Sequence, residues 1–71
     1  MAYQVTSALP GSVWKILVEV GQQVEEDQSV VIVESMKMEN DMFTDQAGTV
    51  KAILVEQGQA VQAGQPLVEI E

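Results

Sequence analysis

Lys37 is the residue of this chain with the clearest capacity for chemistry, and it lies between two methionines, Met36 and Met38. The chain has no histidine, no cysteine and no arginine, and its other basic residues are Lys15 and Lys51. Any chemistry that the chain supports therefore has very few residues to rest on, and a lysine at the junction of the chain is the leading candidate.

Other polar residues around Lys37 offer weaker alternatives. Glu39, Asp41 and Asp45 could form a carboxylate pair for acid–base work or a metal site, but without histidine a solvated polar rim is favoured. Ser35 and Thr44 have no base to activate them, which excludes nucleophilic catalysis. Lysine at the middle of the chain remains the leading candidate.

The chain repeats itself at an offset of 37 residues. Residues 11–34 align with 48–71 and share 12 identities in 24 positions. The identical pairs are Gly11/Gly48, Val13/Val50, Ile16/Ile53, Leu17/Leu54, Val18/Val55, Glu19/Glu56, Gly21/Gly58, Gln22/Gln59, Val24/Val61, Gln28/Gln65, Val31/Val68 and Glu34/Glu71. One copy cannot bury its own apolar face, so we expect two copies packed about a pseudo-twofold axis. This predicts one domain over 1–71, with halves of about 1–37 and 38–71.

Short segments rich in β-branched residues alternate with glycine turns, which predicts an all-β fold. We expect eight strands, four in each half, near 3–8, 12–19, 23–24, 29–35, 39–44, 49–56, 60–61 and 66–71. Val13 and Ile16 are three residues apart and recur as Val50 and Ile53. Strict alternation fails at that spacing, so each copy should contain a bulge.

Two unmatched pairs of the repeat predict local features. Trp14 aligns with Lys51, which predicts an exposed or half-exposed position. Asp27 aligns with Gly64, which predicts a turn residue with positive φ. The twofold relation also exchanges the junction at 35–37 with the pair of chain ends. We therefore expect Lys37 and the chain ends at opposite ends of the molecule.

Charge and composition exclude several classes of function. The net charge is −8, which argues against binding to nucleic acid or to an anionic membrane surface. The N-terminal Met1–Gln4 lacks a basic start and an apolar leader, and no apolar run approaches the roughly 18 residues of a membrane span. With no cysteine for disulfides, these features predict a cytoplasmic protein.

The residues around Lys37 resemble the biotinyl/lipoyl attachment domain family, and most closely its biotin carboxyl carrier type. The resemblance rests on Glu34-Ser35-Met36-Lys37-Met38-Glu39, on Pro10-Gly11-x-Val13, and on Gly-Gln-x-Val at 21–24 and 58–61. It covers residues 5–71. Biotin carriers commonly have Ala where this chain has Ser35, whereas lipoyl members typically carry Asp before the lysine and Ala or Val after it. Methionines on both sides favour biotin.

The resemblance implies a flattened barrel, a barrel-sandwich hybrid of two four-stranded antiparallel sheets with a pseudo-twofold repeat and the modified lysine at a hairpin tip. It implies biotin joined covalently to Lys37 by a biotin protein ligase, with Met36 and Met38 as flanking recognition residues. Glu34, Ser35 and Glu39 would surround the tip. The partners implied are a biotin carboxylase and a carboxyltransferase, with the chain itself a non-catalytic carrier of carboxyl groups.

Two alternatives stay open at this point. A lipoyl carrier domain would use the same lysine for a different cofactor. An unmodified barrel-sandwich module would serve only as an interaction element. The sequence also fits both a standalone protein and a segment of a larger carboxylase subunit.

Overall fold

Eight strands and no helix make up the part of the chain that the computed structural model describes, residues 3–71. Met1 and Ala2, where the first repeat half was expected to begin, lie outside the described residues. The strands are β1 (Tyr3–Thr6), β2 (Gly11–Ile16), β3 (Gln23–Val24), β4 (Ser29–Ser35), β5 (Met38–Phe43), β6 (Gly48–Ile53), β7 (Ala60–Val61) and β8 (Pro66–Ile70). The predicted all-β fold is confirmed, and no described segment is a helix long and apolar enough to cross a membrane.

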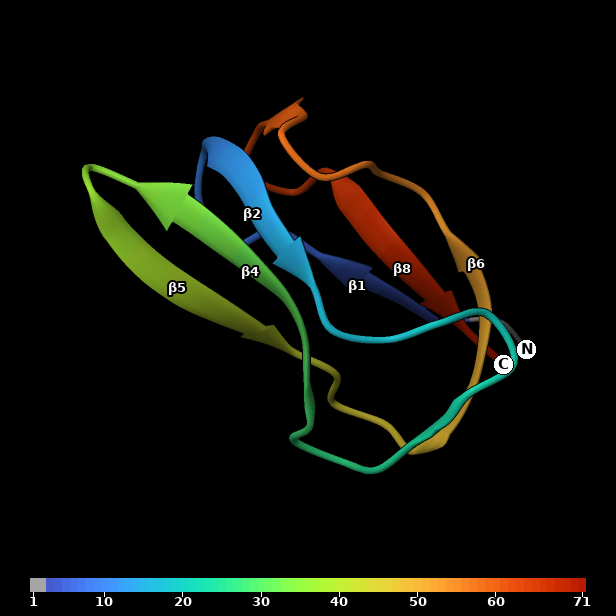
Figure 1. Ribbon diagram of the computed structural model, residues 1–71. Helices are drawn as coiled ribbons and strands as arrows, with labels where there is room; N and C mark the ends of the chain where they lie inside the picture. Colours follow the sequence, from blue (N-terminus) through green and yellow to red (C-terminus); the bar gives the residue numbers. More distant parts are fainter. Residues whose placement is uncertain (1–2) are drawn as a thin grey trace.

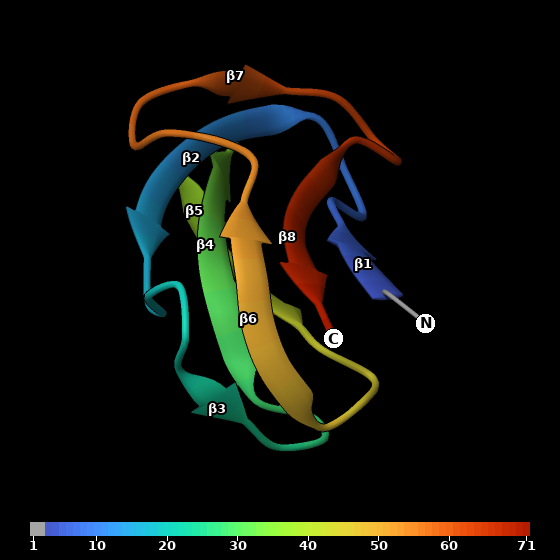
Figure 2. The ribbon, with the colours of Figure 1, turned by 90° about the vertical axis from the view of Figure 1, so that its right-hand side faces the viewer.

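The strands form two four-stranded antiparallel sheets that obey the repeat (Figure 1). One sheet, the terminal sheet, has the order β1-β8-β6-β3, and the other, the hairpin sheet, has the order β5-β4-β2-β7. The 37-residue offset turns β1, β2, β3 and β4 into β5, β6, β7 and β8, so it converts the first order into the second. Each sheet therefore contains strands from both halves of the chain. The two halves are interleaved, as the view in Figure 2 shows from the side.

Several strands end earlier than the sequence predicts, and turn chemistry explains the first of them. β1 ends at Thr6 rather than at residue 8 because the buried Ser7 hydroxyl donates a hydrogen bond to the Leu9 carbonyl at 2.6 Å. Its repeat partner Thr44 donates to the Gln46 carbonyl at 2.7 Å. A hydroxyl bonded to the backbone two residues on closes a local turn and stops the ladder. β2 ends at Ile16 and β6 at Ile53, where predictions ran to 19 and 56.

Four turns share one construction in which glutamine caps the turn. The side-chain oxygen of Gln22 accepts the Glu19 N–H at 3.1 Å, and Gln59 accepts the Glu56 N–H at 3.0 Å. Gln28 and Gln65 do the same for the backbone N–H three residues earlier, each at 3.0 Å. The residue before each glutamine has positive φ: Gly21 at 91°, Asp27 at 67°, Gly58 at 88° and Gly64 at 84°. The predicted left-handed conformation at Asp27 is thereby confirmed.

Replacing Gly64 by alanine should lower the free energy of unfolding by about 1 kcal/mol, the cost of a left-handed backbone for a residue with a Cβ. The Cβ itself meets nothing within 4 Å, so the loss is conformational rather than steric. Gly64→Asp should cost less, because Asp27 already adopts this conformation in the other half. Urea denaturation of both variants measures the difference. Equal losses for alanine and aspartate would contradict this account of the turn.

Both predicted bulges are present. The register between β2 and β4 shifts between Val13 and Lys15, and the register between β6 and β8 shifts between Val50 and Ala52. Each bulge leaves one extra residue, Trp14 or its counterpart Lys51, on the outer surface. The predicted exposure of Trp14 is confirmed at 42%.

The core lies between the two sheets and is almost entirely aliphatic. Its buried members come from both repeat halves: Val5, Val13, Val18, Val24, Val30, Val31, Val33, Met42, Val50, Val55, Val61, Leu67, Val68 and Ile70. Each fully buried aliphatic side chain contributes about 1.5–3 kcal/mol relative to exposure. This core holds the two sheets together and so supports the β4–β5 hairpin that extends beyond them.

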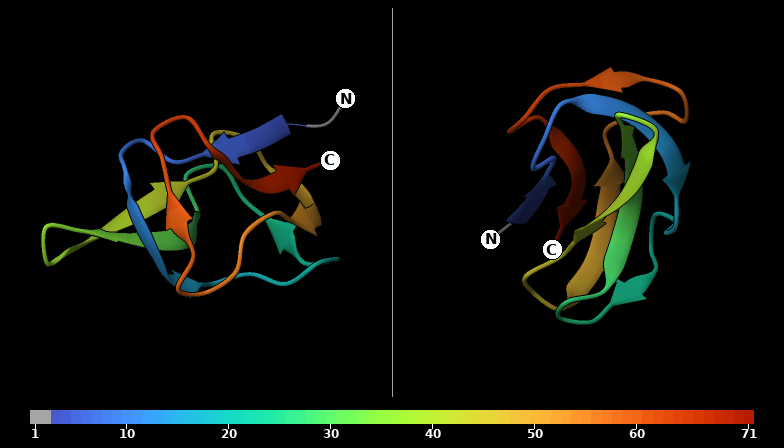
Figure 3. Two further views of the ribbon diagram at one scale, coloured as in Figure 1. Left: turned by 90° about the horizontal axis from the view of Figure 1, so that it is seen from above. Right: turned by 90° about the vertical axis from the view of Figure 1, so that its left-hand side faces the viewer.

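The β4–β5 hairpin projects beyond the barrel at one end, and the start of β1 and the end of β8 lie together at the other (Figure 3). Tyr3 pairs with Ile70 there, and the Tyr3 hydroxyl donates a hydrogen bond to Asp45 Oδ2 at 3.2 Å. Burial raises the pKa of this phenol, and the Asp45 carboxylate adds to the rise. The expected separation of Lys37 from the chain ends is confirmed.

Candidate functional site

The candidate site is the tip of the β4–β5 hairpin. Glu34 pairs with Glu39 and Ser35 pairs with Met38, so the two strands stay in register to the end. Only Met36 and Lys37 remain to make the turn. The structure thus brings together all six residues that the sequence singled out for this site.

A glycine allows strand β2 to lie close to β4 near the tip of the hairpin. A Cβ on Gly11 would collide with the Glu34 carbonyl oxygen and would lie 2.9 Å from Val33 Cγ1. β2 can lie this close to β4 only because the position has no side chain. Gly48 plays the same part against Glu71 in the other half, where a Cβ would lie 2.8 Å from the Glu71 carbonyl oxygen.

Both residues of the tip adopt left-handed backbone conformations, with φ of 54° at Met36 and 65° at Lys37. Positive φ at both central residues of a two-residue loop defines a type I′ turn, which usually contains Asn-Gly. Methionine and lysine adopt this conformation at a cost of roughly 1–2 kcal/mol each. The tip therefore stores backbone strain, a feature that concentrates at functional sites.

Replacing Met36 by asparagine should raise the free energy of unfolding by about 1 kcal/mol, because asparagine tolerates the left-handed region that methionine occupies there. Met38→Asn is the matched control, since Met38 lies in strand β5 and has no positive φ. Urea denaturation compares the two variants. If the urea midpoint of Met36→Asn were no higher than that of Met38→Asn, the turn would not be strained.

The tip is open to solvent. Met36 is 92% exposed and Met38 67% exposed, values that are unusual for apolar side chains, and Lys37 is exposed between them. Within residues 3–71 both ion pairs involve Lys51, and neither involves Lys37. The Lys37 amine is therefore available to another molecule.

The two faces of the hairpin differ in chemistry because side chains alternate along a strand. Glu34 and Glu39 are directly opposite each other and both are exposed, which places two like charges side by side. Such a pair disfavours the fold slightly. Ser35 and Met38 occupy the other face. An incoming partner thus meets a negative face and a face with a hydroxyl and a thioether.

Asn40 supports the tip and was missed in the sequence analysis. Its side-chain nitrogen donates hydrogen bonds to the Val33 carbonyl at 3.3 Å and to the Met38 carbonyl at 3.2 Å. The bond to Val33 ties β5 to β4 just behind the turn, and the bond to Met38 lies within β5. The available signal was a polar residue opposite Val33, at a register position where an apolar residue would be expected.

The arrangement offers an amine but no catalytic apparatus of its own. Among residues 3–71 no group of three or more histidine, cysteine or acidic side chains is placed to hold a metal ion. The nearest acidic residues, Glu34 and Glu39, are exposed to water rather than enclosed with Lys37. The geometry suits modification of Lys37 by another protein.

Comparison with known proteins agrees with this geometry. The family model described as "Biotin-requiring enzyme" matches residues 3–70. The chain belongs to this family. Among relatives in the family, the biotin carboxyl carrier protein of Streptococcus mutans is 46% identical over 87% of this chain and 48% of its own length. The biotin/lipoyl attachment protein of Bacillus subtilis is 39% identical over 93% of this chain and 90% of its own length.

Larger members of the family contain a similar segment. The chain is 40% identical to 9% of the human mitochondrial propionyl-CoA carboxylase alpha chain, over 92% of its own residues. The solved urea carboxylase of Kluyveromyces lactis matches the whole chain with a TM-score of 0.94 and 34% identity, over 6% of that enzyme. A single-chain, multi-domain long-chain acyl-CoA carboxylase matches 96% of the chain with a TM-score of 0.88 and 26% identity, over 7% of that enzyme. The chain spans about half of the Streptococcus mutans protein and a small part of each carboxylase.

Proposed function

We propose that this chain is a biotin carboxyl carrier domain over residues 1–71, with biotin attached covalently to Lys37. The observation that carries the proposal is an exposed, unpaired lysine at the apex of a strained two-residue turn, in a chain of the biotin-requiring family. Biotin supplies a ring nitrogen that takes up and releases a carboxyl group. The protein holds that cofactor and does not itself catalyse a reaction.

Each residue of the tip has a defined part in this function. Lys37 provides a primary amine on a four-carbon stem, and its acylation produces a long flexible tether. Met36 and Met38 present unbranched, polarizable side chains that fit against a ligase without one fixed geometry. Glu34, Ser35 and Glu39 form the surroundings that a partner meets on the two faces of the hairpin.

Similarity to carboxylases supports a set of protein partners. Relatives and structural neighbours of this chain are parts of carboxylases, among them propionyl-CoA, urea and long-chain acyl-CoA carboxylases. By extension, a biotin protein ligase would load Lys37, a biotin carboxylase would charge the carrier, and a carboxyltransferase would discharge it. The net charge of −8 supports partners other than nucleic acid or membrane, and cytoplasmic location stays a prediction.

Intact mass measurement tests the proposal. The purified chain is incubated with a biotin protein ligase and its substrates, and we expect the mass to increase by one biotinyl group. Peptide mapping should place that group on Lys37 and leave Lys15 and Lys51 unmodified. An unchanged mass with active ligase, shown on a known acceptor domain in the same assay, would refute the proposal.

A lipoyl carrier is the second candidate, and one observation favours it. The Bacillus subtilis relative is described as a biotin/lipoyl attachment protein, so its name covers both cofactors. Incubation with a lipoyl-attaching ligase provides the comparison. A lipoyl adduct on Lys37 without a biotin adduct would identify lipoate as the cofactor in place of biotin. If neither ligase changes the mass, the chain is an unmodified interaction module.

A further inference from the structure

The internal repeat allows the outer surfaces of the two sheets to be compared position by position. Every outer position on the hairpin sheet has a counterpart on the terminal sheet, related by 37 residues and held by the same strand arrangement. The two positions of a pair therefore have nearly the same backbone environment, and the fold constrains their side chains in nearly the same way. Where one sheet is polar and the other apolar, the fold alone does not require the apolar residue.

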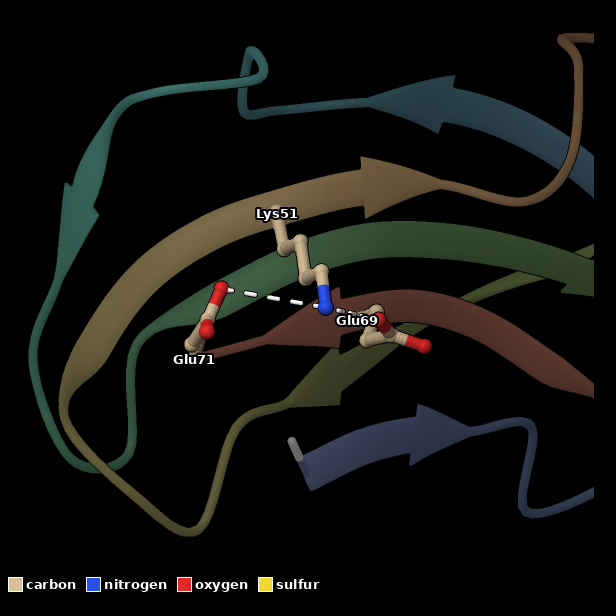
Figure 4. A network of polar contacts seen from close by, with 3 residues as sticks. All are labelled: Lys51, Glu69 and Glu71. Atoms are coloured by element: carbon tan, nitrogen blue, oxygen red, sulfur yellow. Dashed lines mark ion pairs between the residues drawn. The ribbon is translucent and has the colours of Figure 1, made fainter. Parts of the chain in front are cut away.

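The outer face of the terminal sheet is polar and ion-paired. Lys51 Nζ on β6 lies 3.6 Å from Glu69 Oε1 on β8 and 3.9 Å from Oε2 of Glu71, the residue after β8 (Figure 4). These contacts are partly exposed, so their contribution to stability is small. They show that charged residues fit this position of the fold.

The hairpin sheet has apolar residues at the matching positions. Trp14 corresponds to Lys51 and Ile32 to Glu69, and the third member, Phe43, corresponds to the exposed Thr6. Trp14 is 42% exposed and Phe43 53% exposed. We call Trp14, Ile32 and Phe43 the apolar face.

The three residues lie on one side of the hairpin sheet. Their chain neighbours Val13, Val33 and Met42 are buried on the core side, and alternation turns the members of the apolar face outward. Ile32 on β4 pairs with Asp41 on β5, and Phe43 is two residues further along β5 on the same side. Trp14 is the extra residue of the β2 bulge beside Ile32, at the edge of an open hollow that Ser12, Lys15, Gln57 and Gly58 help to line.

Acidic residues lie beside the apolar face and between it and the hairpin tip. Glu34, Glu39 and Asp41 are exposed on the same side of the hairpin sheet, and Lys15 is the basic residue within it. A second copy of this chain would bring the same acidic rim and a further charge of −8, so self-association is disfavoured. A protein surface with an apolar depression and a rim of lysine and arginine is complementary to it.

We propose that the apolar face is the docking surface for the ligase that acylates Lys37, and this inference rests on the proposed function. The Lys37 amine reaches only about 6 Å from its backbone, so an enzyme that modifies it must contact the hairpin. Enzymes that act at the far end of the loaded tether have no such requirement. The strands that form the hairpin, β4 and β5, contribute Ile32 and Phe43 to the apolar face.

A reciprocal exchange between the two sheets tests this inference. The double variant W14K/I32E gives the hairpin sheet the Lys–Glu pair that the terminal sheet already accommodates at 3.6 Å. The control variant K51W/E69I gives the terminal sheet the apolar pair. Each exchange trades one lysine and one glutamate, so the net charge stays at −8. Both variants must first show cooperative urea unfolding near the wild-type midpoint.

Steady-state kinetics with a biotin protein ligase provides the readout. For W14K/I32E we expect KM for the carrier to rise at least tenfold with kcat within twofold of wild type, and for K51W/E69I we expect neither to change by more than twofold. The single variant Phe43→Thr, which inserts the residue of the opposite sheet, should raise KM by a smaller factor and covers the case in which the double variant misfolds. KM should also rise with salt in the wild type, because the acidic rim contributes attraction.

Three results would overturn the inference while leaving the proposed function intact. The first is an unchanged KM in W14K/I32E when Lys37 of the wild type is modified. The second is an equal rise in KM in K51W/E69I, since the effect would then not belong to the hairpin sheet. The third is a wild-type dimer in sedimentation that W14K/I32E dissociates, which would make the apolar face a self-interface. Failure to modify the wild type at all would instead refute the proposed function.

Discussion

The Lys37→Arg variant is expected to show no mass increase after incubation with a biotin protein ligase, while the wild type gains one biotinyl group. Arginine preserves the positive charge and the length of the side chain, but its guanidinium stays protonated and cannot be acylated under these conditions. The chain has only three lysines, so the matched controls are Lys15→Arg and Lys51→Arg, which should both be modified like the wild type. Intact mass under identical conditions compares all four proteins.

The Lys37→Arg result also separates chemistry from folding. Lys37 is exposed and has no ion pair with residues 3–71, so its replacement should leave the urea unfolding midpoint unchanged. Full modification of the Lys37→Arg variant would mean that the ligase uses another amine, and peptide mapping would identify it. Loss of modification in Lys15→Arg as well would point to damaged docking rather than to a missing acceptor.

Leu67→Ala is expected to cost the most stability of any substitution considered, about 2–5 kcal/mol. Leu67 lies on β8 with 0% of its surface exposed, and its replacement removes buried methyl groups and leaves a cavity in the only core of the described residues. A domain of this size has a total stability on the order of 4–10 kcal/mol, so the loss is a large fraction of the whole. Urea denaturation and thermal unfolding measure it.

Leu54→Ala is the matched control for Leu67→Ala, because it makes the same chemical change at a leucine that is 43% exposed. We expect a loss of less than about 1 kcal/mol there, since little apolar surface is withdrawn from water. Similar losses at both leucines would show that the core is not organised as described. The ligase should still modify Leu54→Ala, because Leu54 follows β6 and lies outside the β4–β5 hairpin.

The sequence predicts the strands well because the same spacing of apolar and turn residues occurs in both halves of the repeat. The spacing of Val13 and Ile16 recurs at Val50 and Ile53, and the structure has a bulge in both places. The alignment of Asp27 with Gly64 likewise predicts a positive φ that the structure confirms. The position of Lys37 at a tip follows from the same symmetry.

The backbone at the tip could not be predicted in the same way. Type I′ turns are recognised from Asn-Gly, and Met36-Lys37 gives no such signal. The conformation is imposed by the pairing of Ser35 with Met38, which leaves two residues to reverse the chain. Local sequence preference is overruled there by the register of the strands.

Contacts between distant residues account for the other features that sequence analysis missed. Asn40 is informative only once its amide is seen to bond the Val33 and Met38 carbonyls. Trp14 is visible in the sequence as a mismatch with Lys51, but its meaning depends on the ion pair between Lys51 and Glu69 on another strand. Side-chain pairing across a sheet has no trace in the order of residues along one strand.

The interleaving of the two halves has a topological consequence. β1 lies beside β8 as β5 lies beside β4, so the two sheets have two equivalent places where neighbouring strands could be joined by a tight turn. At one of these places the chain passes through Met36 and Lys37, and at the other Tyr3 and Ile70 are paired without a connection. The lysine arm and the chain ends are thus alternative uses of one architectural position, and a circular permutant could exchange them without altering a single strand.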